Sequence, residues 1–235
     1  MSLKFACFVT GTDTGVGKTL ISSALLHGLS QAGLKTVGMK PLAAGAEMRD
    51  GDLYNDDVAA LEGASSLSVP RELVVPYLLK EPAAPHIAAA LERIAIDPQR
   101  LLSAYAQLTS EAEAVVVEGV GGFRVPLTDD FDTADLAKKL QLDVILVVGL
   151  RLGCLNHALL TAEAIAARGL RLAGWVANQI DPAMPHQQSN IDALRSRLSV
   201  PLIGSVPFMA QTSAAAAAQY LDFRWTEVVP DESSL

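Results

Sequence analysis

Charged and aromatic residues are both scarce in this chain, and these scarcities narrow the class of protein. Aromatic residues make up 5% and charged residues 19% of the 235 residues, whereas 50% are hydrophobic. A chain with this balance is unlike a disordered protein and can bury a sizeable core. The length suits one large α/β domain, with two small domains as the alternative.

Cysteine is almost absent as well. Cys7 and Cys154 are the only two cysteines, which excludes a disulfide framework and a cysteine-rich metal cage. Cys7 lies within an apolar run and is predicted to be a small core residue.

The sequence also lacks long apolar runs and an excess of basic residues. No run reaches the ~20 residues needed to span a bilayer, and no signal peptide is recognisable at the N-terminus. The formal net charge of -8 argues against a nucleic acid or an anionic membrane as partner. We therefore expect a cytoplasmic protein that binds neither.

Short apolar runs alternate with amphipathic stretches along the whole chain. This alternation predicts a single α/β domain over residues 1–235, with a mostly parallel sheet and helices on both of its faces. Residues 43–57 are predicted to form a functional loop, and residues 70–85 an irregular stretch. The predicted strands are 5–10, 36–39, 114–118, 144–148, 172–177 and 202–206. The predicted helices are 19–32, 56–62, 85–93, 97–110, 132–140, 156–168, 187–198 and 214–218.

The glycine-rich segment GTDTGVGKT, Gly11–Thr19, lies between a predicted strand and a predicted helix. Glycines let successive backbone N–H groups approach phosphate oxygens, and the following helix points its positive end at them. Lys18 can reach the β- and γ-phosphates, and the Thr19 hydroxyl suits a magnesium ion. The segment predicts a P-loop NTPase type of fold that binds a nucleoside triphosphate with magnesium. Gly11 stands one residue earlier than the common P-loop spacing requires.

Two carboxylates are candidates for further magnesium ligands. Glu118 ends the buried-type run AVVVE and precedes three glycines within four residues. A charged residue at the end of a buried strand favours a functional role, because an unpaired buried carboxylate is costly. Asp57 is the second candidate, with a helix N-cap or a first-turn acid as an equal alternative.

Lys40 and Asn178 each end a predicted strand, at the sheet edge where parallel α/β folds bind ligands. A solvated lysine is an equal alternative for Lys40. Asn178 can present a donor and an acceptor to a base edge, and a turn-forming asparagine is at least as good an interpretation.

Together, several segments closely resemble the dethiobiotin synthetase family. They cover residues 8 to 207 in the family's order. Besides GTDTGVGKT they are Lys40-Pro41 with Gly45, Glu81–His86, Val117–Gly122, Val148–His157 and Gly174–Asn178.

The resemblance implies an ATP- and magnesium-dependent ligase of biotin synthesis. Such an enzyme converts 7,8-diaminononanoate and CO2 into dethiobiotin, with ADP and phosphate as the other products. One amine takes up CO2 as a carbamate, and the carbamate oxygen attacks the γ-phosphate to give a carbamic–phosphoric anhydride. The second amine then closes the ring as phosphate leaves. A homodimer is also implied.

Roles for individual residues follow from the same resemblance. The implied catalytic residues are Lys18, Lys40 and Thr14, and the implied magnesium ligands are Thr19, Asp57 and Glu118. The nucleotide would contact Gly15, Val16, Gly17, Lys18, Thr19, Leu20, Asn178, Pro207, Phe208 and Met209. The substrate would contact Lys40 and Ala44, and its distal carboxylate would bind across a two-fold interface at Arg151, Leu152, Gly153, Cys154 and Asn156.

Three positions depart from the family pattern. Ala44 stands where many members carry a hydroxyl residue, and Gly15 where some carry glutamate. Ala214–Ala218 replaces residues that are more often polar. These departures bear on substrate contact and on nucleotide selectivity.

The main alternative is a P-loop ATPase switch of the partitioning type that binds a protein partner. Such proteins carry a lysine near position 12, which is Thr12 here, and often a terminal amphipathic membrane helix, which the C-terminus Asp231–Leu235 does not suggest. A small-molecule kinase would leave phosphate on its product. The related cobyrinate-amidating enzymes would need a further glutaminase domain, for which no length is expected to remain.

Overall fold

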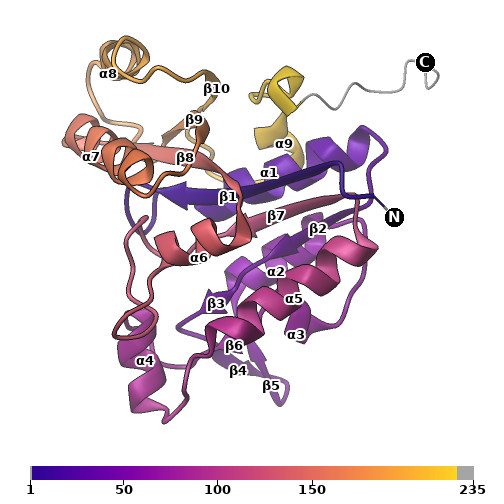
Figure 1. The fold of residues 1–235 in the computed structure, drawn as a ribbon. Coiled ribbons are helices and arrows are strands. Elements are labelled where there is room, and N and C mark those ends of the chain that lie inside the picture. Colours follow the sequence, from indigo (N-terminus) through magenta and orange to yellow (C-terminus); the bar gives the residue numbers. More distant parts are fainter. Residues whose placement is uncertain (1, 227–235) are drawn as a thin grey trace.

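The central element of the computed structural model, which describes residues 2–226, is a six-stranded sheet. All its strands are parallel, in the order β10-β9-β8-β1-β7-β2 (Figure 1). The predicted parallel sheet is therefore confirmed. The strands are β1 (Phe5–Gly11), β2 (Thr36–Met39), β7 (Ala114–Glu118), β8 (Asp143–Leu150), β9 (Leu172–Gln179) and β10 (Leu202–Val206).

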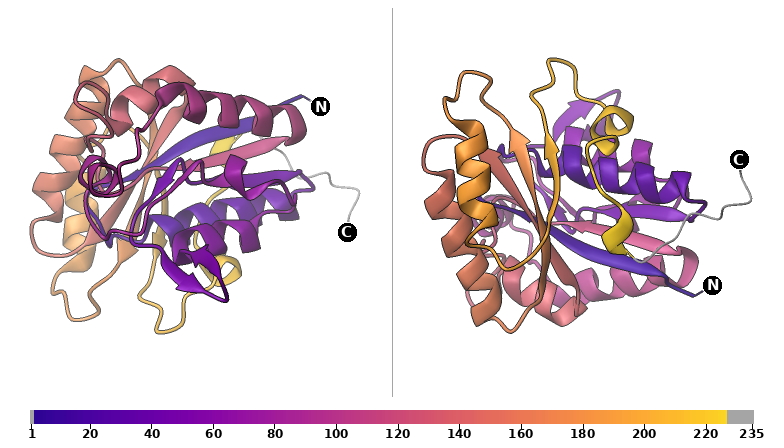
Figure 2. Two further views of the ribbon diagram at one scale, coloured as in Figure 1. Left: turned by 90° about the horizontal axis from the view of Figure 1, so that it is seen from below. Right: turned by 90° about the horizontal axis from the view of Figure 1, so that it is seen from above.

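Helices cover both faces of this sheet (Figure 2). Successive strand residues point to opposite faces, so Phe8 packs into one layer of the core while Cys7 and Val9 pack into the other. On the Cys7 face lie α1 (Lys18–Gln31), α2 (Asp56–Ala64) and α9 (Ala214–Ala218). On the Phe8 face lie α5 (Pro98–Glu111), α6 (Thr133–Leu140), α7 (Cys154–Ala167) and α8 (Gln187–Arg195).

The functional loop predicted over residues 43–57 is more regular than a loop. The segment contains an antiparallel hairpin of β4 (Glu47–Arg49) and β5 (Asp52–Tyr54). Asp50 and Gly51 join the two strands with φ values of 53° and 93°. Positive φ at both positions is the geometry that an Asp-Gly pair favours in a tight hairpin.

The stretch 70–85 is also more regular than predicted. It contains the short helix α3 (Arg71–Val74) and the strand β6 (Tyr77–Leu78), which pairs in parallel with β3 (Leu42–Ala43). The helix α4 (Pro85–Leu91) then begins with proline at its first position, where a missing N–H costs nothing. The last element is a 3-10 turn, Arg224–Thr226.

The sheet brings three sequence-predicted segments to one edge. The phosphate loop follows β1, Lys40 follows β2, and Glu118 is the last residue of β7. Because β7 lies between β1 and β2, the carboxyl ends of the three strands are neighbours. This is the edge at which parallel α/β sheets bind ligands.

Within residues 2–226, no helix is both long and apolar enough to cross a membrane. The C-terminal segment for which the sequence suggests no amphipathic helix, Asp231–Leu235, lies outside the described residues.

Candidate active site

The phosphate loop takes its shape from two glycines in left-handed conformation. Gly15 has a φ of 73° and Gly17 a φ of 88°. A Cβ at Gly17 would lie 2.1 Å from Asn178 Nδ2, which donates a hydrogen bond of 2.9 Å to the carbonyl of Val16. Gly17 precedes α1, whose N-terminus has no side-chain cap within the described chain. Its first N–H groups thus have no side-chain partner, as an anion site requires.

Lys18 is the cation of this loop. It is 7% exposed, and its Nζ donates to the carbonyl of Asp13 at 3.2 Å. Burial, together with the nearby Lys40 cation, lowers the pKa of Lys18 to about 8. Phosphate oxygens beside Lys18 would offset both effects by favouring its charged form.

A compact polar cluster joins Thr19, Lys40, Asp57 and Glu118. The Thr19 hydroxyl lies 2.7 Å from Asp57 Oδ1 and 2.9 Å from Glu118 Oε1. Lys40 Nζ donates to Asp57 Oδ2 at 2.8 Å, to Glu118 Oε1 at 2.5 Å and to the carbonyl of Gly119 at 3.3 Å. The structure thus brings four sequence-predicted site residues into direct contact.

Opposite charges within the cluster offset the cost of burying Lys40 and Asp57. Burial alone lowers the pKa of Lys40, but the Glu118 and Asp57 carboxylates outweigh it, and the net pKa lies above the ordinary value. Burial likewise raises the pKa of Asp57, but the Lys40 charge and hydrogen bonds from Lys40 and Thr19 hold it below its usual range. Lys40 is therefore cationic and Asp57 anionic at neutral pH.

The donor set fits magnesium. Two carboxylates and one hydroxyl are hard oxygen ligands, which magnesium prefers. Glu118 is fully buried, and its Oε2 has no hydrogen-bond partner among the described residues. A carboxylate oxygen left without a partner in the interior is well suited to a cation. Within residues 2–226, no three His, Cys, Asp or Glu side chains lie together as a metal cluster. The third oxygen ligand of the set is therefore the Thr19 hydroxyl.

Asp57 reconciles the two interpretations that its sequence position left open. It lies in the first turn of α2, whose N-cap is Asn55, and its N–H donates to Asn55 Oδ1 at 3.1 Å. Its carboxylate nevertheless points to Thr19 and Lys40. The residue is both a first-turn acid and a member of the cluster.

A cavity of about 870 Å³ lies over the cluster and the phosphate loop. Predicted residues that line it are Thr14, Gly15, Gly17, Lys18, Thr19, Lys40, Ala44, Asp57 and Glu118. Pro82 to Pro85 and the glycines after β7 complete the wall. The predicted chemical groups thus share one space large enough for a small-molecule ligand.

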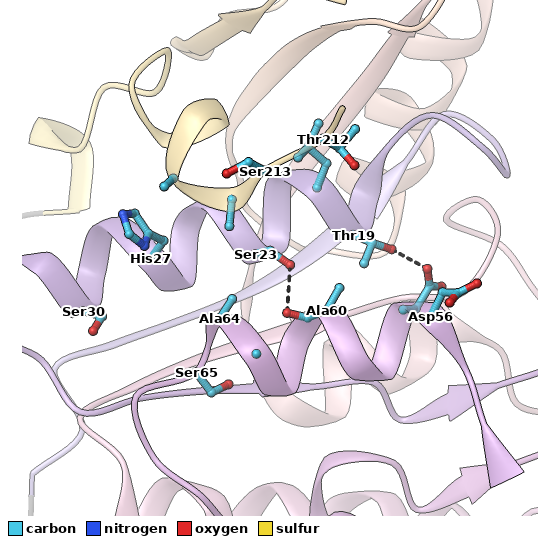
Figure 3. Close-up of a pocket in the computed structure, with 15 residues that line it drawn as sticks. Thr19, Ser23, His27, Ser30, Asp56, Ala60, Ala64, Ser65, Thr212 and Ser213 are labelled. Atoms are coloured by element: carbon cyan, nitrogen blue, oxygen red, sulfur yellow. Dashed lines mark hydrogen bonds between the residues drawn. The ribbon is translucent and has the colours of Figure 1, made fainter. Parts of the chain in front are cut away.

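A second hollow of about 680 Å³ runs from Thr19 between α1, α2 and the start of α9 (Figure 3). Its wall is rich in hydroxyl groups, among them Ser23, Thr212 and Ser213. Thr19 and Asp57 line both hollows. Sequence reasoning missed these hydroxyl residues, because only the packing of α9 against α1 brings residues 212 and 213 to this place.

No residue of the predicted carboxylate-binding segment lines the 870 Å³ cavity in its own chain, although Asp13, which contacts the segment, does. Arg151 forms an ion pair with Asp13 of the phosphate loop. Leu152 is 97% exposed, Gly153 has a φ of 95° and Asn156 is exposed. Cys154 is buried at the start of α7. The segment is therefore not brought to Lys40 within one chain, and its substrate role stays a prediction.

The residues predicted to contact the base lie at the end of β9, in the case of Asn178, and directly after β10. Asn178 is 4% exposed, with its amide directed at the phosphate loop. Phe208 is 46% exposed, and its N–H donates to Gln179 Oε1 at 3.1 Å. Met209 packs against the core layer that contains α1, as does Leu20. Sequence reasoning missed Asp13 and Gln179, whose partners only the folded chain brings near.

Comparisons with known proteins place this site in a family. A family model described as an AAA domain matches residues 6–216. The chain is 59% identical over 227 residues to the ATP-dependent dethiobiotin synthetase BioD of Janthinobacterium sp. (strain Marseille), covering 95% of this chain and 96% of the relative. It is 56% identical over 216 residues to the protein of the same name from Aromatoleum aromaticum, covering 92% and 96%.

Solved structures with a similar fold are much more distant in sequence. The septum site-determining protein MinD from Pyrococcus horikoshii, complexed with Mg-ADP, is 16% identical, with a TM-score of 0.55 and coverage of 97% of this chain and 94% of that one. A ParA family ATPase from Chlorobium tepidum is 13% identical, with a TM-score of 0.55 and coverage of 95% and 99%. These likenesses confirm the P-loop NTPase type of fold and nothing finer. By its sequence similarity to the curated relatives, the chain belongs to the ATP-dependent dethiobiotin synthetase family.

Proposed function

We propose that this chain joins 7,8-diaminononanoate and CO2 into dethiobiotin, with ATP converted to ADP and phosphate. The observation that carries the proposal is the cluster of Lys18, Lys40, Thr19, Asp57 and Glu118 around one cavity. Family membership supplies the substrates, and the cluster supplies the groups that phosphoryl transfer needs.

The reaction needs phosphate activation, because a carbamate oxygen is a poor leaving group. The carbamate of one amine would attack the γ-phosphate, and the second amine would displace phosphate from the resulting anhydride. In-line transfer depends mainly on positioning and charge neutralisation. Lys18 and the loop N–H groups would hold the phosphates, with Thr14 beside the reacting one. Lys40 would hold the carbamate and offset the growing negative charge.

Thr19, Asp57 and Glu118 would hold magnesium. When bound, magnesium would neutralise phosphate charge. The short contacts of the Thr19 hydroxyl with both carboxylates, to one of which it donates, support this assignment, since they show that all three oxygen groups lie together.

Nucleotide recognition is assigned to the phosphate loop from Gly15 to Leu20, and to Asn178 with Pro207, Phe208 and Met209 on the base side. Asn178 also stabilises the loop through Val16. Ala44 lines the cavity without a hydroxyl, so substrate contact at that position is apolar.

The proposal includes a homodimer. The family resemblance assigns the substrate's distal carboxylate to Arg151, Leu152, Gly153, Cys154 and Asn156 of a second copy. Exposed apolar side chains support burial of surface in an assembly: Leu152, and also Ile87, Leu91 and Ile94, which are 46%, 65% and 38% exposed. A single domain, a cytoplasmic location and the lack of nucleic-acid and membrane partners remain predictions.

The test is release of ADP and phosphate from ATP, magnesium and bicarbonate, with and without 7,8-diaminononanoate. We expect release to depend strictly on the diamine, and dethiobiotin to be detected by mass spectrometry. Hydrolysis that ignores the diamine, without a cyclic product, would contradict the proposal and favour an ATPase switch.

A further inference from the structure

Lys40 already holds the position between the two carboxylates. Its ammonium contacts Asp57 at 2.8 Å and Glu118 at 2.5 Å, and the Thr19 hydroxyl contacts the same two carboxylates. The Lys40 side chain is 3% exposed and that of Glu118 is 0% exposed. Lys40 is therefore the counter-charge that allows Glu118 to be buried.

Lys40 shares two carboxylates with the assigned magnesium site. Its ammonium contacts Asp57 Oδ2 and Glu118 Oε1, whereas the Thr19 hydroxyl contacts Asp57 Oδ1 and Glu118 Oε1. A divalent ion bound to the same two carboxylates would lie close to the ammonium, and two cations at short range repel each other. The ammonium and a metal ion therefore compete for the negative charge of Asp57 and Glu118.

We propose that Lys40 is a resident cation that a divalent metal ion displaces, and that the displaced lysine is then turned toward the anionic substrate. This inference rests on the proposed assignment of Thr19, Asp57 and Glu118 as metal ligands. While Lys40 is paired with two carboxylates, they neutralise its positive charge. Once a metal ion neutralises them, that charge can act on a carbamate or a γ-phosphate.

Two features of the described chain support the exchange. Lys40 lines the 870 Å³ cavity together with Lys18 and Ala44, so its side chain has space to move into. Glu118 Oε2 has no hydrogen-bond partner among residues 2–226, which gives a metal ion an oxygen that Lys40 does not use. The cluster thus offers an incoming ion an oxygen ligand and offers Lys40 a space to move into.

Metal binding without nucleotide tests the proposal directly. Mn²⁺ bound to the whole chain is counted by electron paramagnetic resonance for wild type, Lys40→Met and the control Lys4→Met. Lys4 pairs with Glu113 at 2.8 Å on the surface, so its loss removes a lysine–carboxylate pair far from the cluster. We expect Lys40→Met to bind one Mn²⁺ at least about tenfold more tightly than wild type, within the usual range of coupling between two sites. Equal affinity in Lys40→Met and wild type would overturn the proposal.

A second measurement uses the wild-type chain and does not depend on a variant that folds. Lysine acylation is mapped by mass spectrometry with and without Mn²⁺ at a concentration that saturates the resonance signal. We expect Lys40 to be protected without metal and to react at least about fivefold faster with it, while Lys4 reacts equally in both. Unchanged protection of Lys40 would overturn the proposal. Neither measurement involves turnover, so both outcomes are independent of whether dethiobiotin is formed.

Discussion

At the scale of single residues, Gly17 decides the shape of the phosphate loop. Its φ of 88° is a backbone angle that residues with a side chain rarely adopt, and Asn178 Nδ2 fills the space where a Cβ would lie. Asn178 in turn holds Val16 through the 2.9 Å hydrogen bond. A glycine, an amide and a backbone carbonyl thus stabilise one loop conformation together.

Replacing Gly17 by alanine should abolish this arrangement. We expect Gly17→Ala to weaken ADP binding at least about tenfold, because Asn178 must move and release Val16, a loss of about 1.4 kcal/mol or more. Isothermal titration calorimetry measures the affinity. Gly33→Ala is the matched control, since Gly33 has a φ of 84° with nothing within 4 Å of its Cβ position. It should cost about 1–2 kcal/mol of stability and leave ADP affinity unchanged. Equal ADP affinity in the two variants would contradict this account.

Glu118→Gln should raise the magnesium requirement sharply. The change keeps the shape of the side chain but removes a buried negative charge that contacts Thr19 and Lys40. We expect the magnesium concentration for half-maximal turnover to rise at least about tenfold, equivalent to about 1.4 kcal/mol. Glu113→Gln, which breaks an ion pair with Lys4 elsewhere, is the control and should titrate like wild type. A magnesium titration of Glu118→Gln that matches wild type would remove the ligand assignment.

The sequence predicts which residues meet at this site better than how they meet. Lys40 and Glu118 each follow or end a buried run, Thr19 follows the phosphate loop after β1, and parallel strands carry such positions to one edge. The pairing of Lys40 with both carboxylates depends on strand register and on where α2 packs. The Arg151–Asp13 ion pair joins residues 138 positions apart in the sequence, so no local sequence pattern predicts it.

At the scale of elements, the start of α6 is held by an ionic network. Asp132 and Asp135 form a capping box, with hydrogen bonds of 2.9 and 3.1 Å to each other's N–H groups. Arg124 and Arg168 both pair with Asp132. Burial raises the pKa of Asp132, but these partners outweigh it and hold the pKa below its usual range.

The lowered pKa of Asp132 makes the network sensitive to acid. A carboxylate with a folded pKa below the unfolded value, about 3.9 for aspartate, stabilises the fold above that value. This contribution is lost as pH falls through the folded pKa. Asp132→Asn keeps a good N-cap but has no charge, so it should lower the free energy of unfolding by about 1 kcal/mol at neutral pH.

Urea unfolding at about pH 7 and at acid pH measures this contribution. We expect the difference between wild type and Asp132→Asn to shrink as pH falls. Asp192→Asn, at an exposed pair with Arg195, serves as control and should change little at either pH. If the difference in free energy of unfolding between wild type and Asp132→Asn stays constant with pH, the charge of Asp132 is not its cause.

Elements were predictable where burial is continuous. The runs that became β2, β7 and β10 match their predicted limits. β2 and β7 are buried throughout, as strands covered on both faces are, whereas β10 at the sheet edge is buried only in part. The hairpin of β4 and β5 was missed because its strands are short and mostly exposed. The Asp50-Gly51 pair was the available signal for it, although no alternating apolar pattern flanks this pair.

At the scale of the whole molecule, the parallel sheet brings to one edge the groups proposed to bind phosphate, metal and substrate. The phosphate loop, Lys40 and Glu118 come from three adjacent strands, and all open into one cavity. The segment after β8 does not reach that cavity in its own chain. If it binds substrate, a second copy must supply it, which ties activity to assembly.

Leu152 provides the test of this dependence. It is 97% exposed in the chain, and its burial between two copies would stabilise them by about 1.5–3 kcal/mol. We expect wild type to sediment at about twice its chain mass of 24.8 kDa, and Leu152→Asp to shift toward the single chain. The KM for the diamine should rise at least about tenfold, while ADP affinity, set by the phosphate loop of each chain, should not change.

Leu160→Asp is the matched control for this experiment. Leu160 is 56% exposed on α7, the helix that begins two residues after Leu152. The change adds the same charge at an exposed leucine outside the predicted segment, so the mass and the KM should stay as in wild type. A Leu152→Asp chain that keeps the wild-type mass and KM would contradict the shared site. A monomer with an unchanged KM would separate assembly from substrate binding and leave the carboxylate subsite to residues of the same chain.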